Sequence, residues 1–279
     1  KVGILFDWEN WWAVEYSSGP SAALKYTDEV HKYYDALYQQ NIAVDMVPMD
    51  GDFSQYDVLI APVMYMVKPG VAARLEQFTQ NGGTFITTFF SGIVNENDIV
   101  TLGGYPGELR SLLGIWAEEI DALFPDQHNA IVMNDTFGKL SGQYECGLLC
   151  DLIHSEGADV IATYGQDFYK GMPVVTRNRF GQGEAWYVGT SPEASFLQGL
   201  LGQICEARGI QPILPAAAGI EAVKRTKDGQ SYVFVLNHNA EAQTFDLGSV
   251  SGTELLTGKK LSGSAEVAGR GVLIIEETK

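Results

Sequence analysis

Short apolar runs alternate with helix-period segments through the first two thirds of the chain. Strands are predicted at residues 2–6, 43–47, 57–62 and 84–90, and helices at residues 26–40 and 71–80. Strands that alternate with helices of this length imply right-handed crossovers and a mainly parallel sheet covered on both faces. We therefore expect an α/β domain with a doubly wound sheet.

The pattern loosens after Gly92. Further helices are predicted at residues 108–119, 147–154 and 193–208, and a hairpin across residues 173–190. Gly181 and Gly183 are expected to supply the positive φ that a tight hairpin turn needs, and Gly209 suits the end of the last helix.

A domain boundary is predicted in "IQPILPAAAG", residues 210–219. This stretch has two prolines, little charge and neither helical nor strand periodicity. Only strand patterns follow, and Asp228-Gly229 between two alternating runs is a strong hairpin signal. We expect an α/β domain over residues 1–211 and a small antiparallel β-sandwich domain over residues 212–279.

Charge and composition limit the classes of partner and the cellular location that are expected. The chain has 18 Lys and Arg against 35 Asp and Glu, a net charge of -17, which disfavours nucleic acid and anionic membrane. Three cysteines do not make a disulfide framework, so a cytoplasmic location is expected. Because the chain begins at Lys1 and enters an apolar strand at once, we expect it to be part of a longer protein.

The stretch "FDWENWW" is the first candidate site. It follows the first predicted strand, and open α/β sheets bind ligands in loops at the carboxyl ends of their strands. Asp7 and Glu9 have a spacing that glycosidase carboxylates can use, but two acids in one loop more often face water. Trp8, Trp11 and Trp12 leave three interpretations open: packing within the domain, a subunit or domain interface, and a sugar-binding platform.

The stretch "GGTFITTFFSG" has the shape of the nucleophile elbow in doubly wound sheets of the glutamine amidotransferase kind. Phe90 stands about where the cysteine would be, so thioester chemistry is excluded. Ser91 lacks the flanking glycine pattern of a hydrolase elbow, and no histidine follows at a persuasive position. A serine hydrolase is therefore disfavoured.

The stretch "CGLLCDLIH" spaces Cys146, Cys150 and His154 four residues apart, on one face if helical. One zinc ion could take two of them, but the outer pair would lie about 12 Å apart on a straight helix. Small buried cysteines on a core helix are the better interpretation. No metal or cofactor is expected.

One long block carries a family resemblance. "SGIVNENDIVTLGGYPGELRSLLGIWAEEID", residues 91–121, closely resembles a hallmark block of the glycoside hydrolase family 42 β-galactosidases. "VGILFDWENWW" and "GQGEAWYVGTSPE" look like the flanking signatures of the same α/β domain. The resemblance continues through the small β domain and covers essentially the whole chain.

The resemblance implies that the catalytic machinery lies elsewhere. In that family both catalytic glutamates, and the structural metal where present, lie on an N-terminal barrel that has no counterpart here, so no catalytic residue is assigned. The α/β domain is similar to an amidotransferase-like trimerisation module, which implies a homotrimer. Asp7, Trp8, Glu9, Trp11 and Trp12 then become candidates for a surface that packs against the barrel or an adjacent subunit and helps to wall the substrate.

The expected function is thus the non-catalytic oligomerisation and C-terminal region of a β-galactosidase that hydrolyses terminal β-D-galactosyl residues. The chain alone is expected to be inactive, and galactoside to bind only the full-length enzyme. Two alternatives stay open: a free-standing carbohydrate-binding module that uses Trp8, Trp11 and Trp12, and a small-molecule enzyme of amidotransferase ancestry that uses Ser91.

Overall fold

The computed structural model describes residues 1–17 and 19–278. The chain divides into two compact units. The first contains Lys1–Tyr34 and Asp45–Gln203, and the second contains Asp35–Val44 and the chain from Ile204 onward.

The first unit is built on one large sheet. In the described chain its strand order is β11-β7-β6-β8-β9-β10-β4-β3-β1-β2, and β5 pairs with β7 outside this path. The strands are β1 (Val2–Phe6), β2 (Val44–Pro48), β3 (Val58–Ala61), β4 (Thr84–Thr88), β5 (Ile115–Ala122), β6 (Asn129–Met133), β7 (Gln143–Ser155), β8 (Asp159–Tyr164), β9 (Pro173–Phe180), β10 (Gly183–Val188) and β11 (Thr190–Pro192). The helices are α1 (Trp8–Tyr16), α2 (Tyr26–Tyr38), α3 (Val71–Gln80), the 3-10 turn η1 (Gly107–Leu109), α4 (Arg110–Leu113) and α5 (Ala194–Ala207).

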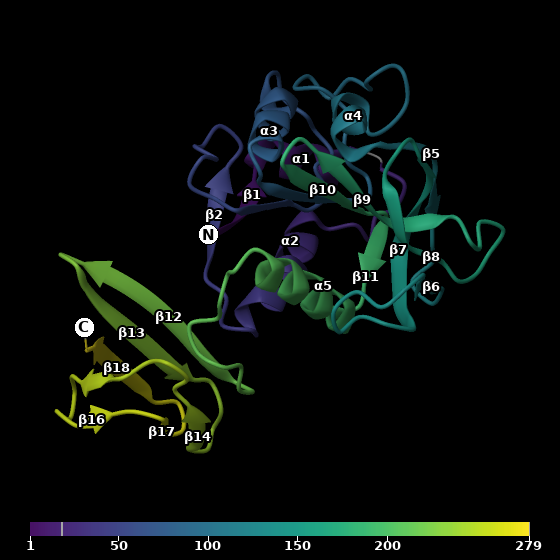
Figure 1. Cartoon of the computed structure of the whole chain (residues 1–279). Coiled ribbons are helices and arrows are strands. Elements are labelled where there is room, and N and C mark those ends of the chain that lie inside the picture. The colour runs from purple at the N-terminus through teal and green to yellow at the C-terminus, as the bar shows by residue number, and fades with distance from the viewer. Residues whose placement is uncertain (18, 279) are drawn as a thin grey trace. The chain divides into compact units, whose positions relative to one another are not determined.

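The pairing confirms the predicted α/β class and adds to it. β1, β3, β4 and β10 pair in parallel. From β10 onward the sheet continues through the antiparallel strands β9, β8, β6 and β7. Figure 1 shows α3 and α4 on one face of the parallel strands and α2 and α5 on the other.

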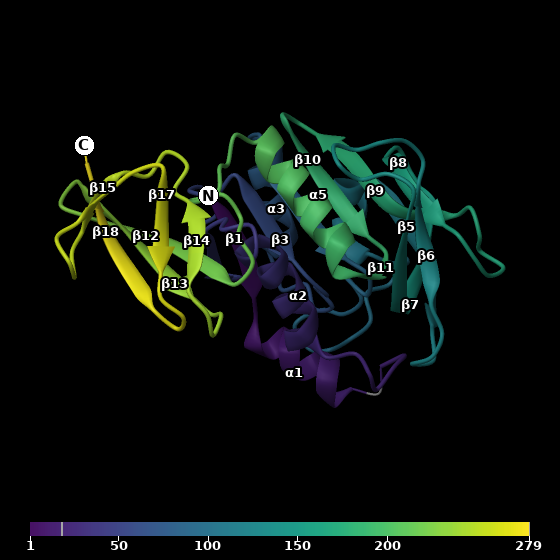
Figure 2. The same ribbon diagram turned by 90° about the horizontal axis from the view of Figure 1, so that it is seen from below.

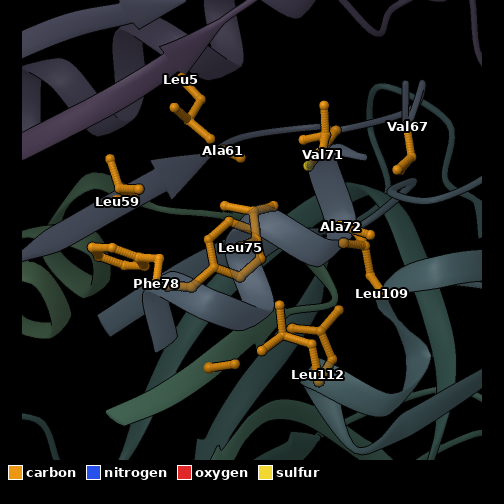
Figure 3. Close-up of a cluster of buried hydrophobic side chains, with 14 of the residues drawn as sticks. Leu5, Leu59, Ala61, Val67, Val71, Ala72, Leu75, Phe78, Leu109 and Leu112 are labelled. Carbon is orange, nitrogen blue, oxygen red and sulfur yellow. The ribbon is translucent and has the colours of Figure 1, made fainter. Parts of the chain in front are cut away.

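One apolar cluster packs α3 and α4 against the sheet. Alternate residues of each strand point to this face, as in Leu59 of β3 and Phe85 of β4, which lie side by side. Leu75 and Phe78, one turn apart on α3, meet them there (Figure 3). The helix is thus held by its apolar stripe, as its sequence period predicts.

The predicted helix at residues 108–119 is wrong. Only η1 and the four residues of α4 are helical. Gly114 ends α4 with a left-handed φ of 62°, and the chain then enters β5. A β-branched and aromatic start to this segment, Ile115 and Trp116, favours the strand.

The predicted helix at residues 147–154 is wrong as well, because this segment lies within β7. The strand pairs with β5, β6 and β11, so three neighbours satisfy its backbone. Tertiary hydrogen bonding outweighs the local helical spacing of its apolar residues.

The second unit contains two antiparallel sheets. Its strands are β12 (Ile220–Lys227), β13 (Gln230–Asn237), β14 (Gln243–Asp246), β15 (Gly252–Glu254), β16 (Lys260–Leu261), β17 (Ser264–Val267) and β18 (Val272–Glu277). The order is β12-β13-β18-β15-β16 in one sheet, and β14 pairs with β17 in the other. Val235 and Ile275 of the first sheet share a buried core with Phe245 and Val267 of the second. The predicted hairpin is present, with positive φ at Asp228 and Gly229.

A segment distant in sequence completes this unit. Asn41 is buried, accepts the Ala222 backbone N–H at 2.9 Å through its side-chain oxygen, and directs its side-chain nitrogen toward the Leu214 carbonyl at 3.4 Å. Its own carbonyl accepts the Ile213 N–H at 2.9 Å. The residues after α2 are therefore an integral part of the second unit.

Candidate interface at the ends of β1 and β4

The tryptophan-rich stretch is a helix, so the prediction of a loop there is wrong. Asp7 is the N-cap of α1: its backbone is extended and its side chain accepts the Glu9 N–H at 3.2 Å. Glu9 in the first turn adds a favourable interaction with the helix dipole. Figure 2 shows α1, in purple, at the margin of the first unit.

A buried asparagine fixes α1 to the segment that follows β3. The Asn10 side chain is fully buried, donates to the Val63 carbonyl at 3.0 Å and accepts the Met66 N–H at 2.8 Å. Val63 has a left-handed φ of 47°, a costly conformation for a β-branched residue. Sequence analysis did not single out Asn10, although a polar residue inside an aromatic run was the available signal.

The exposed side of α1 is an aromatic face made of Trp8, Trp12 and Tyr16. These side chains are 58%, 50% and 87% exposed, and their four-residue spacing places them along one side of the helix. Trp11 is half-buried, packs 5.3 Å from Trp8 between ring centroids and donates to Glu15 at 2.7 Å. Tyr16 was missed because its place in the stripe is visible only once the segment is recognised as a helix.

A groove of about 660 Å³ runs beside the aromatic face. Its walls include Phe6, Trp8, Trp12, Met49 and Lys68. The groove therefore combines aromatic side chains with the charged side chain of Lys68.

Lys68 joins the two candidate carboxylates. Its ammonium nitrogen lies 2.8 Å from Asp7 Oδ2 and 2.6 Å from Glu9 Oε2. Burial lowers the pKa of Lys68, but its hydrogen bonds to Asp7 and Glu9 outweigh this effect, and the net result is a raised pKa. Both carboxylates are therefore partners of one cation. This arrangement differs from a glycosidase pair, whose carboxyl groups flank a sugar bond.

A second exposed apolar segment follows β4. Its three large side chains, Ile99, Val100 and Leu102, are 60%, 52% and 93% exposed, and together they are called the apolar loop. The loop has an ordered backbone, because Asn95 Oδ1 accepts the N–H groups of Asn97 and Ile99 at 3.0 and 3.2 Å. An ordered loop with exposed apolar side chains is a candidate contact surface.

Tyr65 connects the apolar loop with α1. Its hydroxyl donates to Asp98 at 3.1 Å and interacts with Ser17, which caps the end of α1. Its ring packs 4.9 Å from that of Phe90. One residue, Tyr65, thus contacts both the end of α1 and the apolar loop.

The turn after β4 keeps an elbow-like backbone but no nucleophile. Phe90 has a left-handed φ of 57°, and its N–H donates to Asp151 at 3.1 Å. Ser91 is fully buried, where its hydroxyl oxygen accepts the Met64 N–H at 2.9 Å and lies 2.9 Å from the Thr87 hydroxyl. A side chain so enclosed cannot attack a substrate, which argues against the amidotransferase-derived enzyme.

The two cysteines and the histidine of "CGLLCDLIH" lie on β7 in different environments. Cys146 and Cys150 are buried, whereas His154 is partly exposed, stacks on Trp116 and pairs with Glu118 at 2.6 Å. Within residues 1–17 and 19–278, no three His, Cys, Asp or Glu side chains gather in a way that could hold a metal ion.

In the same part of the chain, no helix has the length and apolar character to span a bilayer.

Comparison with known families decides the relationship. Residues 1–211 match the β-galactosidase trimerisation domain of glycoside hydrolase family 42, and residues 219–277 match the β-galactosidase C-terminal domain. The chain belongs to the family 42 β-galactosidases. A family 42 relative, a β-galactosidase of Planococcus sp. strain L4, is 61% identical over 275 residues, which are 99% of this chain and 41% of that enzyme. A β-galactosidase of Clostridium perfringens is 42% identical over 282 residues, 99% of this chain and 40% of the enzyme.

Solved structures of family 42 enzymes agree with this assignment. The β-galactosidase of Bacillus circulans sp. alkalophilus matches with a TM-score of 0.98 and 60% identity over all of this chain and 41% of its own. That of Rahnella sp. R3 matches with a TM-score of 0.92 and 40% identity over 99% of this chain and 40% of its own. The chain therefore spans about two fifths of the relatives that it matches.

Proposed function

We propose that this chain is the non-catalytic assembly region of a β-galactosidase that hydrolyses terminal β-D-galactosyl residues. The match of residues 1–211 to the trimerisation domain carries the proposal. The missing part of the enzyme supplies the catalytic carboxylates, and the chain alone has no galactosidase activity. The ion-paired Asp7 and Glu9 and the enclosed Ser91 support this division of labour.

The aromatic face is the proposed contact surface, and the assembly is a homotrimer. Trp8, Trp12 and Tyr16 expose more aromatic surface than a monomer usually leaves in water. Aromatic residues are enriched in the buried centres of interfaces. The groove beside them, which Lys68 helps to line, receives polar groups of the neighbouring subunit or of the catalytic barrel.

The proposal extends to ancestry and location. The parallel strands β1, β3 and β4, with helices on both faces and a left-handed turn at Phe90, support descent from an amidotransferase-like, flavodoxin-like domain. The three free cysteines support a reducing, cytoplasmic compartment.

Light scattering tests the assembly directly. We expect a mass near three times 30.5 kDa, without hydrolysis of p-nitrophenyl-β-galactoside by the same sample. Replacing both Trp12 and Tyr16 by Ala should shift the mass toward 30.5 kDa, because large aromatic contacts are lost. Phe124→Ala, which removes another exposed ring, is the matched control and should leave the mass unchanged.

The outcomes are distinct. A trimer that survives the double substitution contradicts the role of the aromatic face, and a monomer at every concentration contradicts assembly through this chain. Hydrolysis by the pure chain overturns the proposed division of labour and returns attention to Asp7 and Glu9.

A further inference from the structure

Two buried thiols lie together at the edge of the large sheet. Cys146 and Cys150 are 3% and 0% exposed, and both are on β7 where it pairs with β11. β11 is the terminal strand of the sheet and is only three residues long. The pair is independent of the aromatic face and of the proposed assembly role.

The pairing register shows why thiols four residues apart approach each other. Cys150 lies opposite Thr190 and Cys146 opposite Pro192, so their partners are only two residues apart. A regular strand would separate residues four apart by about 13 Å, whereas a two-residue step on β11 is roughly 6.6 Å. β7 therefore bulges outward between the cysteines, and Leu148 in the bulge has a left-handed φ of 67°.

The resulting geometry suits a disulfide. A separation of roughly 6.6 Å between the two positions falls inside the range of Cα distances found in disulfides, about 4.4–6.8 Å. Cys150 Sγ lies 3.6 Å from Thr190 Oγ1, and Cys146 lies opposite Pro192, two residues further along β11. Residues two apart on a strand point to the same face, so the pairing places both thiols on one side of the sheet.

The two thiols differ in acidity. The hydrogen bond between them lowers the pKa of Cys150 and raises that of Cys146, and burial adds to the rise at Cys146. Because the thiolate is the reacting form, Cys150 is the first nucleophile and Cys146 the second.

We propose that Cys146 and Cys150 form a reactive dithiol that a low-molecular-weight disulfide, such as oxidised glutathione, converts into an intramolecular disulfide. The Cys150 thiolate attacks one sulfur of the reagent, the reagent's S–S bond breaks, and one glutathione thiolate leaves and takes a proton from solvent. Cys146 then loses its proton and attacks the Cys150 sulfur of the mixed disulfide, which releases the second glutathione. The protein dithiol is oxidised, and the reagent is reduced to two thiols.

The reagent reaches the thiols only when β11 opens locally, because all three residues of this strand are buried. β11 is a three-residue edge strand with an irregular register, so the opening involves a short ladder. Cys205 provides the contrast: it is also buried, but it lies on α5, and burial raises the pKa of its thiol to about 12.

Peptide mapping of the folded 279-residue chain after incubation with oxidised glutathione tests the proposal. We expect a Cys146–Cys150 cross-link, a fall from three free thiols to one, and an unmodified Cys205. Cys146→Ser should stop the reaction at a glutathione adduct on Cys150. Cys150→Ser should leave Cys146 largely unreacted, and Cys205→Ser should change nothing.

Circular dichroism before and after oxidation shows whether each sample is folded. A Cys205 that reacts as fast as Cys150 would refute the selective dithiol. So would a folded chain that keeps three free thiols, or a glutathione adduct that never closes to the cross-link.

Discussion

Asp151 is a buried carboxyl group with incomplete hydrogen bonding. Its Oδ2 accepts the Tyr187 hydroxyl at 2.5 Å and the Phe90 N–H at 3.1 Å, while Oδ1 has no partner among the described residues. Burial raises the pKa of this carboxyl group to about 7, and the two hydrogen bonds only partly oppose the rise. The folded chain therefore holds a proton here that the unfolded chain releases near pH 4.

Asp151→Asn should make stability less dependent on pH. In the parent chain the free energy of unfolding falls as pH rises from about 4 toward 7, by at most roughly 4 kcal/mol from this group. Above pH 7 the carboxylate is charged in both states, and the penalty stays constant. The variant lacks this charge, so thermal melts from pH 5 to 8 should show a flatter profile and a relative gain at pH 8. Parallel profiles for the two proteins would contradict this assignment.

Single residues were predictable where their chemistry was visible and unpredictable where it depended on distant partners. The tryptophans and cysteines stood out by type alone. Asp151 did not, because its partners Tyr187 on β10 and Phe90 in the turn after β4 are distant in sequence and are brought together only by the fold. Nothing within a few residues of Asp151 in the sequence shows that its side chain is buried.

At the scale of elements, α1 depends on one side chain to keep its place. Asn10→Ala removes two hydrogen bonds and leaves the Met66 N–H buried without a partner, while the Val63 carbonyl still accepts the Tyr65 N–H at 2.8 Å. The loss of its partner costs about 1–3 kcal/mol for a buried group. Urea denaturation should therefore show a destabilisation of about 1–3 kcal/mol.

Asn134→Ala is the matched control for this change. Asn134 also donates to a backbone carbonyl, that of Val160 at 2.9 Å, but it is exposed, so water replaces the bond. Its loss should stay within about 0.5 kcal/mol. Equal effects of the two substitutions would show that Asn10 does not hold the helix.

Elements with a single strong period were predicted correctly, and those whose apolar spacing also fits another type of element were not. The period of α3 and the apolar run of β1 each suffice to fix their type. β7 carries an apolar spacing that also fits a helix, and only its pairing with β5, β6 and β11 decides for a strand. The periodicity of one segment contains no information about the strands that pair with it.

At the scale of the whole molecule, the second unit is not a simple C-terminal extension. Residues 35–44 belong to it, and Asn41 satisfies the backbone N–H of Ala222. A fragment of residues 212–279 should therefore be unfolded or poorly cooperative in thermal melts, because it lacks this segment. Adding a peptide of residues 35–44 should restore part of the transition. A fragment that melts as cooperatively alone as with the peptide would contradict this view.

The antiparallel part of the large sheet shows what sequence analysis of the whole chain missed. The β9–β10 hairpin was predicted from its glycines, but its place beside β4 was not. The parallel pairing of β10 with β4 is a contact between segments about a hundred residues apart. Separate predictions for each segment do not contain such a contact.

The aromatic face also gives the chain a spectroscopic property. Three of the chain's five tryptophans lie on α1. Two of these, Trp8 and Trp12, are half or more exposed, while Trp186 is fully buried. Indole emission moves to shorter wavelength when water leaves the ring, so the intrinsic fluorescence of this chain is weighted toward one side of one helix. Any surface that covers α1 should therefore shift the tryptophan emission to shorter wavelength, so binding can be followed without a label.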